Sequence, residues 1–340
     1  MNPDTPSLLP TDTTIEPMGP PPRPSLIHRT FIGADGLRAG WSLLLFVLML
    51  VGVLFAVMKI AMKIHPPSGH HPPEETWVRM MINEGIPFLA IVLITWIMSK
   101  IEGRPNSVYG FGGGRKASLF FAGLGWGFAC LTLLFVILWR GGLLVVDKRL
   151  LYGSDVVRYG AMWLVAFLFV GLLEEYLTRG FMQYTLTRGL AGVYRALFKT
   201  RHSEALGFWT AAIIFSILFG LGHSGNPGES PLGVACAGAA GFLFCFSLWR
   251  TGSLWWAIGF HTSWDWSQSY LYGVADSGMM VQHHLLETHP VGKPILSGGT
   301  TGPEGSAWVI LVMLVAAAII AATLPRHKAY LAGREARVEG

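Results

Sequence analysis

The chain has 340 residues, of which 52% are hydrophobic and only 13% are charged. Soluble globular domains carry about a quarter charged residues, so this composition excludes an ordinary soluble domain and indicates a membrane protein. In such a chain, the net charge of +5 reflects topology in the membrane rather than binding to nucleic acid.

Residues 1–38 contain eight prolines and no apolar periodicity, which predicts a disordered cytosolic tail. Nearly charge-free stretches then recur along the chain, and about 20 such residues cross the hydrocarbon of a bilayer. Three of the stretches must extend past a charged residue to reach that length. The predicted fold class is therefore all-α, a polytopic membrane helical bundle of about eight transmembrane helices, at 39–58, 85–99, 117–139, 159–173, 205–222, 230–249, 251–264 and 305–325.

The distribution of lysine and arginine predicts the orientation of these helices. With the N-terminus inside, the inner segments hold 16 of these residues and the outer segments hold 7. Because cytoplasmic loops are enriched in positive charge, both termini are expected in the cytoplasm. We expect a multi-pass protein of the plasma (inner) membrane, with residues 274–304 as an extracytoplasmic loop and 305–340 as the last transmembrane helix and a basic cytosolic tail.

Ionisable side chains inside a bilayer are costly and usually functional, and here they follow three long apolar runs. The first run ends in Glu174-Glu175-x₃-Arg179. Glu175 and Arg179 are four residues apart with the acid first, so they form a favourable pair on one helix face. Glu174 points about 100° away, toward its i+4 neighbour Thr178, and its carboxylate is left available as a general base for water. The alternative is that both acids simply pair with Arg179.

The other two runs contribute imidazoles. His261 and Asp265 are four residues apart, so either the aspartate orients the imidazole or both groups aim at one bound group. His223 follows Phe219 by four residues in a glycine-rich stretch where a helix can end. A lone membrane histidine is often only a hydrogen-bond donor between helices, but three helices that each carry an acid or an imidazole favour a catalytic site.

The three motifs, EExxxR, FxxxH and HxxxD, in this order on successive apolar segments, resemble the signature of the CAAX-protease and bacteriocin-processing family. This is a family of intramembrane endopeptidases whose eukaryotic members are the type II CAAX prenyl endopeptidases. The resemblance implies a helical-bundle peptidase in which Glu174 and His223 activate water, while His261 and Asp265 bind or polarise the scissile carbonyl. Many members carry asparagine where this chain has Asp265, and an aspartate can donate a hydrogen bond only when it is protonated.

The resemblance divides the chain into N-terminal transmembrane helices at 39–157 and a CAAX-protease-like intramembrane peptidase core at 158–273. The family has been described both as a metalloprotease and as a glutamate-dependent, metal-free protease. Nitrogen and oxygen ligands suitable for zinc are present, although no HExxH pair exists. We expect that no cofactor is required, with zinc as the alternative, held by Glu174, His223, His261 and Asp265.

The expected function is hydrolysis of a peptide bond in a membrane-associated or lipidated substrate by water that Glu174 and His223 activate. The expected partners are a membrane-tethered peptide or protein and the lipid bilayer, and no nucleic acid. One alternative is a non-catalytic membrane protein of the same family, acting in bacteriocin immunity or as a regulatory partner. A weaker alternative is an ion or proton pathway, and the lack of an internal repeat counts against it.

The site imposes one requirement on the fourth span. Glu174 falls about 15 residues into an outside-to-inside helix, and His223 falls about 18 residues into the returning helix, so at 1.5 Å per residue their depths differ. We therefore predict that the fourth helix continues past Gly180 toward Arg188.

Overall fold

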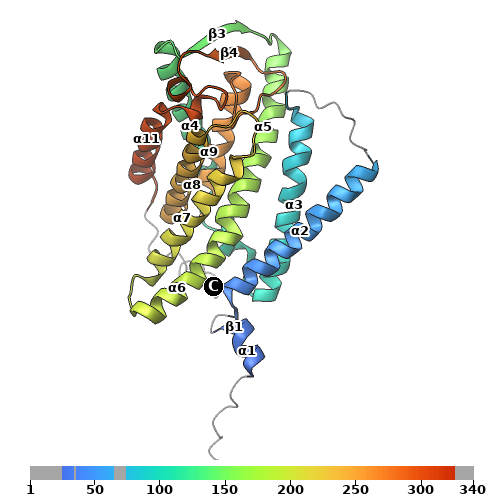
Figure 1. The fold of residues 1–340 in the computed structure, drawn as a ribbon, viewed down its shortest axis with the longest axis vertical. Helices are drawn as coiled ribbons and strands as arrows, with labels where there is room; N and C mark the ends of the chain where they lie inside the picture. Colours follow the sequence, from blue (N-terminus) through green and yellow to red (C-terminus); the bar gives the residue numbers. More distant parts are fainter. Residues whose placement is uncertain (1–24, 34–35, 65–73, 326–340) are drawn as a thin grey trace, which may run out of the picture.

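The computed structural model describes residues 25–33, 36–64 and 74–325, and these form a bundle of long helices with two small two-stranded sheets. Figure 1 shows most of the long helices running along the longest axis of the molecule, with the helix Ala39–Ile64 inclined to the others. The all-α, polytopic fold class is confirmed. The principal helices are α2 (Ala39–Ile64), α3 (Trp77–Glu102), α4 (Lys116–Arg140), α5 (Ser154–Glu175), α6 (Gln183–Phe198), α7 (Ser203–His223), α8 (Pro231–Thr251), α9 (Trp255–Asp265) and α11 (Trp308–Thr323).

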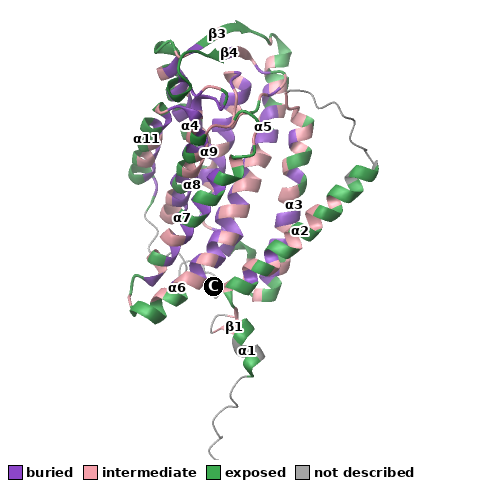
Figure 2. Cartoon of the chain, in the orientation of Figure 1, coloured by how far each residue is buried: buried purple, intermediate pink, exposed green. Residues whose placement is uncertain are grey.

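Each of the eight expected spans falls on a helix, but the helices differ in length. Within the described residues, six helical segments are long and apolar enough to cross a membrane. The stretch predicted at 251–264 forms the 11-residue α9, which continues into a π-helix at Trp266–Leu271 (η3), and the stretch at 305–325 forms the 16-residue α11. The outward faces of the long helices are green in Figure 2, and exposed side chains such as Leu89 and Leu314 suit contact with lipid.

The fourth span is one continuous helical segment of 45 residues from Ser154 to Phe198. It consists of α5, a π-helix at Tyr176–Met182 (η2) and α6. The predicted continuation past Gly180 is therefore confirmed. π-Helical turns inside α-helices occur frequently at functional sites, and this one carries Arg179 of the first motif.

Close approach of helix backbones places the other two motifs. A Cβ on Gly123 of α4 would lie 2.1 Å from the carbonyl oxygen of Trp256, and one on Gly259 of α9 would lie 2.1 Å from that of Phe120. A Cβ on Gly220 of α7 would likewise lie 2.4 Å from the carbonyl oxygen of Val234 on α8. Only glycine allows these contacts, so the glycines set how deeply α9 and α7 sit in the bundle.

One end of the bundle is covered by ordered loops. Strand β3 (Leu144–Arg149) pairs antiparallel with β4 (Leu286–Pro290), as seen at the top of Figure 1. The backbone N–H of Glu75 donates to the carbonyl of Met280 at 2.7 Å. The loops before α3, after α4 and after α9 therefore meet at one end, as the predicted topology requires. Residues 274–304 are more than a loop, because they also contain α10 (Pro294–Ser297) and the 3-10 helix η4 (Pro303–Gly305).

The expectation of disorder throughout 1–38 is wrong for its last part. Residues Leu26–Phe31 form helix α1, and Ile32–Gly33 (β1) pairs with Gly36–Leu37 (β2). Arg188 of α6 donates to the carbonyl of Leu37 at 3.1 Å, a contact across 151 residues that composition cannot predict. Residues 1–24 and the basic tail at 326–340 lie outside the described residues.

Candidate active site

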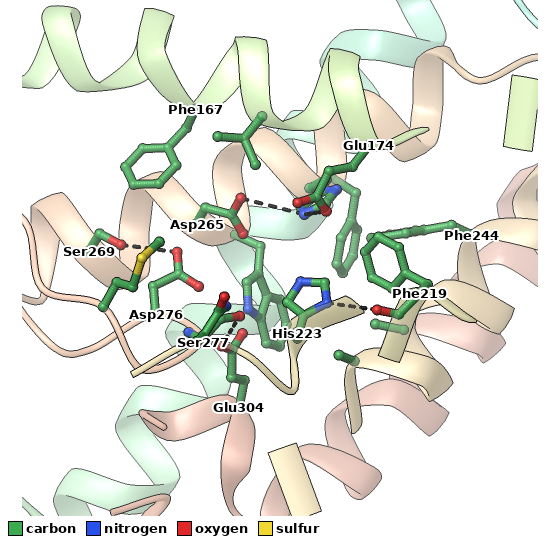
Figure 3. A pocket seen from close by; sticks show the side chains of 18 of the residues that line it. Phe167, Glu174, Phe219, His223, Phe244, Asp265, Ser269, Asp276, Ser277 and Glu304 are labelled. Carbon is green, nitrogen blue, oxygen red and sulfur yellow. Dashed lines mark hydrogen bonds and ion pairs between the residues drawn. The ribbon is translucent and has the colours of Figure 1, made fainter. Parts of the chain in front are cut away.

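The three motifs line one cavity of about 140 Å³ beside α5, α7, α8, α9 and α11. Glu174, His223, His261 and Asp265 all contribute to its lining, and Figure 3 shows Glu174, His223 and Asp265 facing a common space. One water needs about 10–15 Å³ in this measure, so the cavity holds several waters or the end of a substrate side chain. The structure thus brings together residues that are up to 91 positions apart in the chain, from Glu174 to Asp265.

The predicted ion pair lies behind this cavity. The Nη1 atom of Arg179 is 2.8 Å from Oε1 of Glu175, and both side chains have no exposed surface. The guanidinium lies over the ring of Phe219, 4.1 Å from its centroid. A Cβ on Gly241 of α8 would lie 2.4 Å from Nη2 of Arg179, so the missing side chain at that position makes room for the guanidinium.

His261 lies between carboxylates on both sides of its ring. Its Nδ1 is 3.1 Å from Oε1 of Glu175, and its Nε2 is 3.5 Å from Oδ2 of Asp265 and 3.7 Å from Oε2 of Glu174. The strongest contact that orients the imidazole is therefore with Glu175 and not with Asp265. An ionised carboxylate only accepts hydrogen bonds. Either neutral tautomer of His261 would therefore place one unprotonated ring nitrogen next to a carboxylate, with no hydrogen to donate to it. The arrangement therefore favours the imidazolium form.

Glu174 makes no ion pair with Arg179, as its helical position predicted. Its side chain is 27% exposed, and its Oε2 atom has no hydrogen-bond partner within the described part of the chain. The hydroxyl of Thr178 donates to the backbone carbonyl of Glu174 at 2.5 Å and not to its carboxylate. Glu174 thus presents a carboxylate to the cavity that its own helix does not neutralise.

His223 is the last residue of α7. Its Nδ1 lies 2.8 Å from the backbone carbonyl oxygen of Phe219. Because a carbonyl oxygen accepts only, Nδ1 carries the proton, and in the neutral imidazole Nε2 is left with a free lone pair. His223 is therefore held in the tautomer that accepts a hydrogen bond at Nε2.

The cavity also contains acidic residues that sequence reasoning missed. Glu84 of α3, Asp276 and Glu304 all line it. Asp276 accepts a hydrogen bond from the hydroxyl of Ser269 at 3.0 Å, and Glu304 accepts from the hydroxyl of Ser277 at 3.0 Å. In the sequence, all three acids lie at the border of an apolar stretch or in a loop, where a charged residue is usually expected to be exposed to solvent.

Asp276 and Glu304 lie outside the membrane-spanning helices, in the segment that covers the cavity. Burial raises the pKa of Asp276 well above its usual range, and the neighbouring Glu304 carboxyl adds to this. Burial likewise raises the pKa of Glu304, although hydrogen bonds from Ser277 oppose the shift. The two carboxyl groups therefore hold a proton more strongly than exposed carboxyl groups do.

The arrangement does not supply a set of metal ligands. Across residues 25–33, 36–64 and 74–325, no three histidine, cysteine, aspartate or glutamate side chains are placed to hold a metal ion. Glu174, His223, His261 and Asp265 thus do not form a preassembled set of zinc ligands in this structure, and independence from metal stays a prediction.

The fold and the site define a class: a polytopic helical membrane protein with acids and imidazoles from separate helices around one buried cavity. Residues 157–267 match the model of a protein family, described as type II CAAX prenyl endopeptidase Rce1-like. This part of the chain contains all three motifs, and the match supports the CAAX protease family that the motifs predicted. No curated protein and no solved structure matches the chain.

Proposed function

We propose that this protein is an intramembrane endopeptidase that hydrolyses a peptide bond of a membrane-associated substrate. The observation that carries the proposal is the carboxylate of Glu174, which is free of Arg179 and shares one cavity with His223. The family match supports peptidase chemistry. Because Glu175 pairs with Arg179 and Glu174 does not, we assign the catalytic role to Glu174 and a structural role to Glu175.

In this proposal, Glu174 and His223 activate the attacking water. Glu174 is the general base, and it takes one proton of the water as the oxygen attacks the scissile carbonyl carbon. His223 accepts a hydrogen bond from the same water at Nε2, because its Nδ1 proton is committed to the carbonyl of Phe219. The water is thereby held with a lone pair directed at the carbonyl carbon.

His261 stabilises the negative charge that develops on the carbonyl oxygen. As an imidazolium it donates from Nδ1 to Glu175 and presents Nε2–H to the cavity, beside Asp265 and Glu174. When Glu174 takes the proton from water, its charge is neutralised and its attraction for Nε2–H weakens. The donor then becomes available to the oxyanion at the moment it forms.

Collapse of the tetrahedral intermediate requires a proton on the leaving nitrogen. Glu174 returns the proton it took, the C–N bond breaks, and an amine and a carboxylic acid are released. Asp265 and Glu175 act as positioning residues in this scheme, because they hold the imidazolium and take no part in the proton transfers. This role does not require Asp265 to donate a hydrogen bond.

A panel of membrane-tethered peptides tests the proposal. The purified full-length protein is reconstituted in lipid nanodiscs, mixed with the peptides, and the products are identified by mass spectrometry. We expect fragments from the wild-type protein that are missing with Glu174→Gln. A folded wild-type protein that cleaves no member of a broad panel would contradict the proposal.

A further inference from the structure

The cavity is unusually acidic. Five carboxyl side chains line it, and no lysine or arginine stands among its lining residues in the described part of the chain: Glu84, Glu174, Asp265, Asp276 and Glu304. Elsewhere, buried carboxylates have a guanidinium beside them. Glu175 pairs with Arg179 at 2.8 Å, and Glu102 lies 3.5 Å from Arg188. Buried charges in proteins are normally paired in this way. In the cavity the His261 imidazolium lies beside Glu174 and Asp265, whereas Asp276 and Glu304 have no lysine or arginine among the described lining residues as a partner.

Two of these acids lie apart from the hydrolytic groups. Asp276 and Glu304 belong to the segment at 274–304, and in Figure 3 their carboxyl groups lie across the cavity from Glu174. One oxygen of each is held by a serine, Oδ2 of Asp276 by Ser269 and Oε1 of Glu304 by Ser277. Both carboxyl groups line the same cavity. Two ionised carboxyl groups in one buried cavity repel each other, and a cation between them would relieve this repulsion.

Asp265 supplies a separate indication that the cavity receives a polar ligand. Its side chain is only 8% exposed and lines the cavity. Within the described residues its carboxyl group makes no hydrogen bond, and its nearest charged neighbour, Nε2 of His261, is 3.5 Å away. A carboxyl group buried to this degree normally accepts hydrogen bonds, so a donor from outside the chain completes its surroundings.

We propose that Asp276 and Glu304, with Asp265 beside them, form a subsite for a positively charged substrate side chain, that of lysine or arginine, close to the scissile bond. This proposal rests on the proposed endopeptidase function, because the subsite would define which substrates the endopeptidase site accepts. The same charges repel a carboxylate. A peptide bond next to a basic residue in the interior of a chain is therefore favoured over a bond beside a free C-terminal carboxylate.

Binding tests the subsite independently of cleavage. The probes are lipid-tethered fluorescent peptides that are N-acetylated and C-terminally amidated. They differ at one position, which carries lysine, its neutral analogue norleucine, or glutamate. Separate peptide sets place this variable residue at different positions along the peptide. Binding to Glu174→Gln protein in zwitterionic nanodiscs is followed by fluorescence anisotropy, and cleavage by the protein with Glu174 intact is followed in parallel. The zwitterionic lipid keeps the membrane surface from attracting the lysine.

At one position, we expect the lysine peptide to bind at least about tenfold more tightly than the norleucine peptide, in line with measured coupling between close charge pairs. Asp276→Asn with Glu304→Gln should bring this ratio close to one. Glu304→Gln alone keeps the acceptor for Ser277, so it should lower the ratio even if the double variant folds poorly. Glu287→Gln is the matched control, because Glu287 is 47% exposed and pairs with Lys148, and it should leave the ratio unchanged.

A lysine-to-norleucine ratio near one at every position, or a ratio that the subsite variants do not alter, overturns the subsite while cleavage can still occur. If lysine is preferred in binding but no peptide is cleaved, the endopeptidase proposal fails and the cation subsite stands.

Discussion

Glu175 and His261 are 86 residues apart in the chain, and a 3.1 Å hydrogen bond joins Oε1 of the glutamate to Nδ1 of the histidine. The same oxygen accepts from Arg179 at 2.8 Å. One buried carboxylate oxygen thus connects the end of α5, the π-helical turn and α9. Glu175 has a structural task as well as a positioning one, which separates it from its neighbour Glu174.

Glu175→Gln should destabilise the protein. It leaves the fully buried guanidinium of Arg179 without an anion, and breaking a buried pair typically costs about 3–5 kcal/mol. The free energy of unfolding in detergent, obtained from denaturant titration, measures the loss. Glu287→Gln removes an exposed pair and should cost less than about 1 kcal/mol. Equal unfolding curves for Glu175→Gln and the wild type would show that the pair does not have this role.

Glu174→Gln should abolish most of the activity and leave the stability unchanged. Glutamine keeps the size of the side chain but cannot take a proton from water, and general-base catalysis typically contributes about 10²–10⁴-fold. We expect cleavage in the nanodisc assay to fall by at least about 100-fold, while the unfolding curve stays within error of the wild type. Full activity of the purified, folded variant would remove Glu174 from the mechanism.

Removal of metal distinguishes two mechanisms that use the same residues. If Glu174 and His223 alone activate water, treatment with a strong chelator followed by buffer exchange should leave the cleavage rate unchanged. Elemental analysis should then find well under one zinc per chain, and His261→Ala should slow turnover without a loss of metal. Stoichiometric zinc that follows activity through removal and re-addition would instead establish the zinc mechanism, because bound zinc lowers the pKa of its water to about 7.

The Asp276–Glu304 pair should make stability depend on pH. Because the pKa of Asp276 is raised in the folded state, mainly by burial and then by Glu304, the folded protein holds a proton that the unfolded chain releases above roughly pH 4. The contribution of Asp276 to the free energy of unfolding is fully present below that pH and is lost as the pH rises through the folded-state pKa. Glu174 also faces Asp276, and His223 faces Glu304.

We therefore expect the difference in unfolding midpoint between Asp276→Asn and the wild type, measured in detergent, to grow in favour of the variant as the pH is raised from about 4 toward neutrality. Parallel curves for the two proteins over this range would show that Asp276 titrates normally.

Two glycines on the same helix provide a matched test of how α9 is placed. A Cβ on Gly123 would lie 2.1 Å from the backbone oxygen of Trp256, whereas a Cβ on Gly125 would meet nothing within 4 Å. Gly123→Ala should cost at least about 1–3 kcal/mol by overpacking and should lower cleavage, since α9 carries His261. Gly125→Ala should stabilise the helix by about 0.5–1 kcal/mol. Similar effects of the two substitutions would contradict the close contact between α4 and α9.

Much of the architecture could be predicted because it depends on local patterns. Apolar stretches identified the helices, since a span must satisfy its own backbone in lipid. The pair Glu175–Arg179 followed from a spacing of four residues, and the pair forms even though the segment is π-helical. The mismatch in depth between Glu174 and His223 correctly predicted that the fourth helix continues.

The helices, the three motifs and the separation of Glu174 from Arg179 could be read from local sequence patterns, because each of these depends on residues within a few turns of one another. The packing of remote segments was needed to show that Glu175 orients His261 and that Asp276 and Glu304 line the cavity. It was also needed to show that Arg188 holds the strand ending at Leu37. These contacts join remote segments, and which remote segments meet depends on how the glycine-lined helix faces pack, a property that no local spacing encodes.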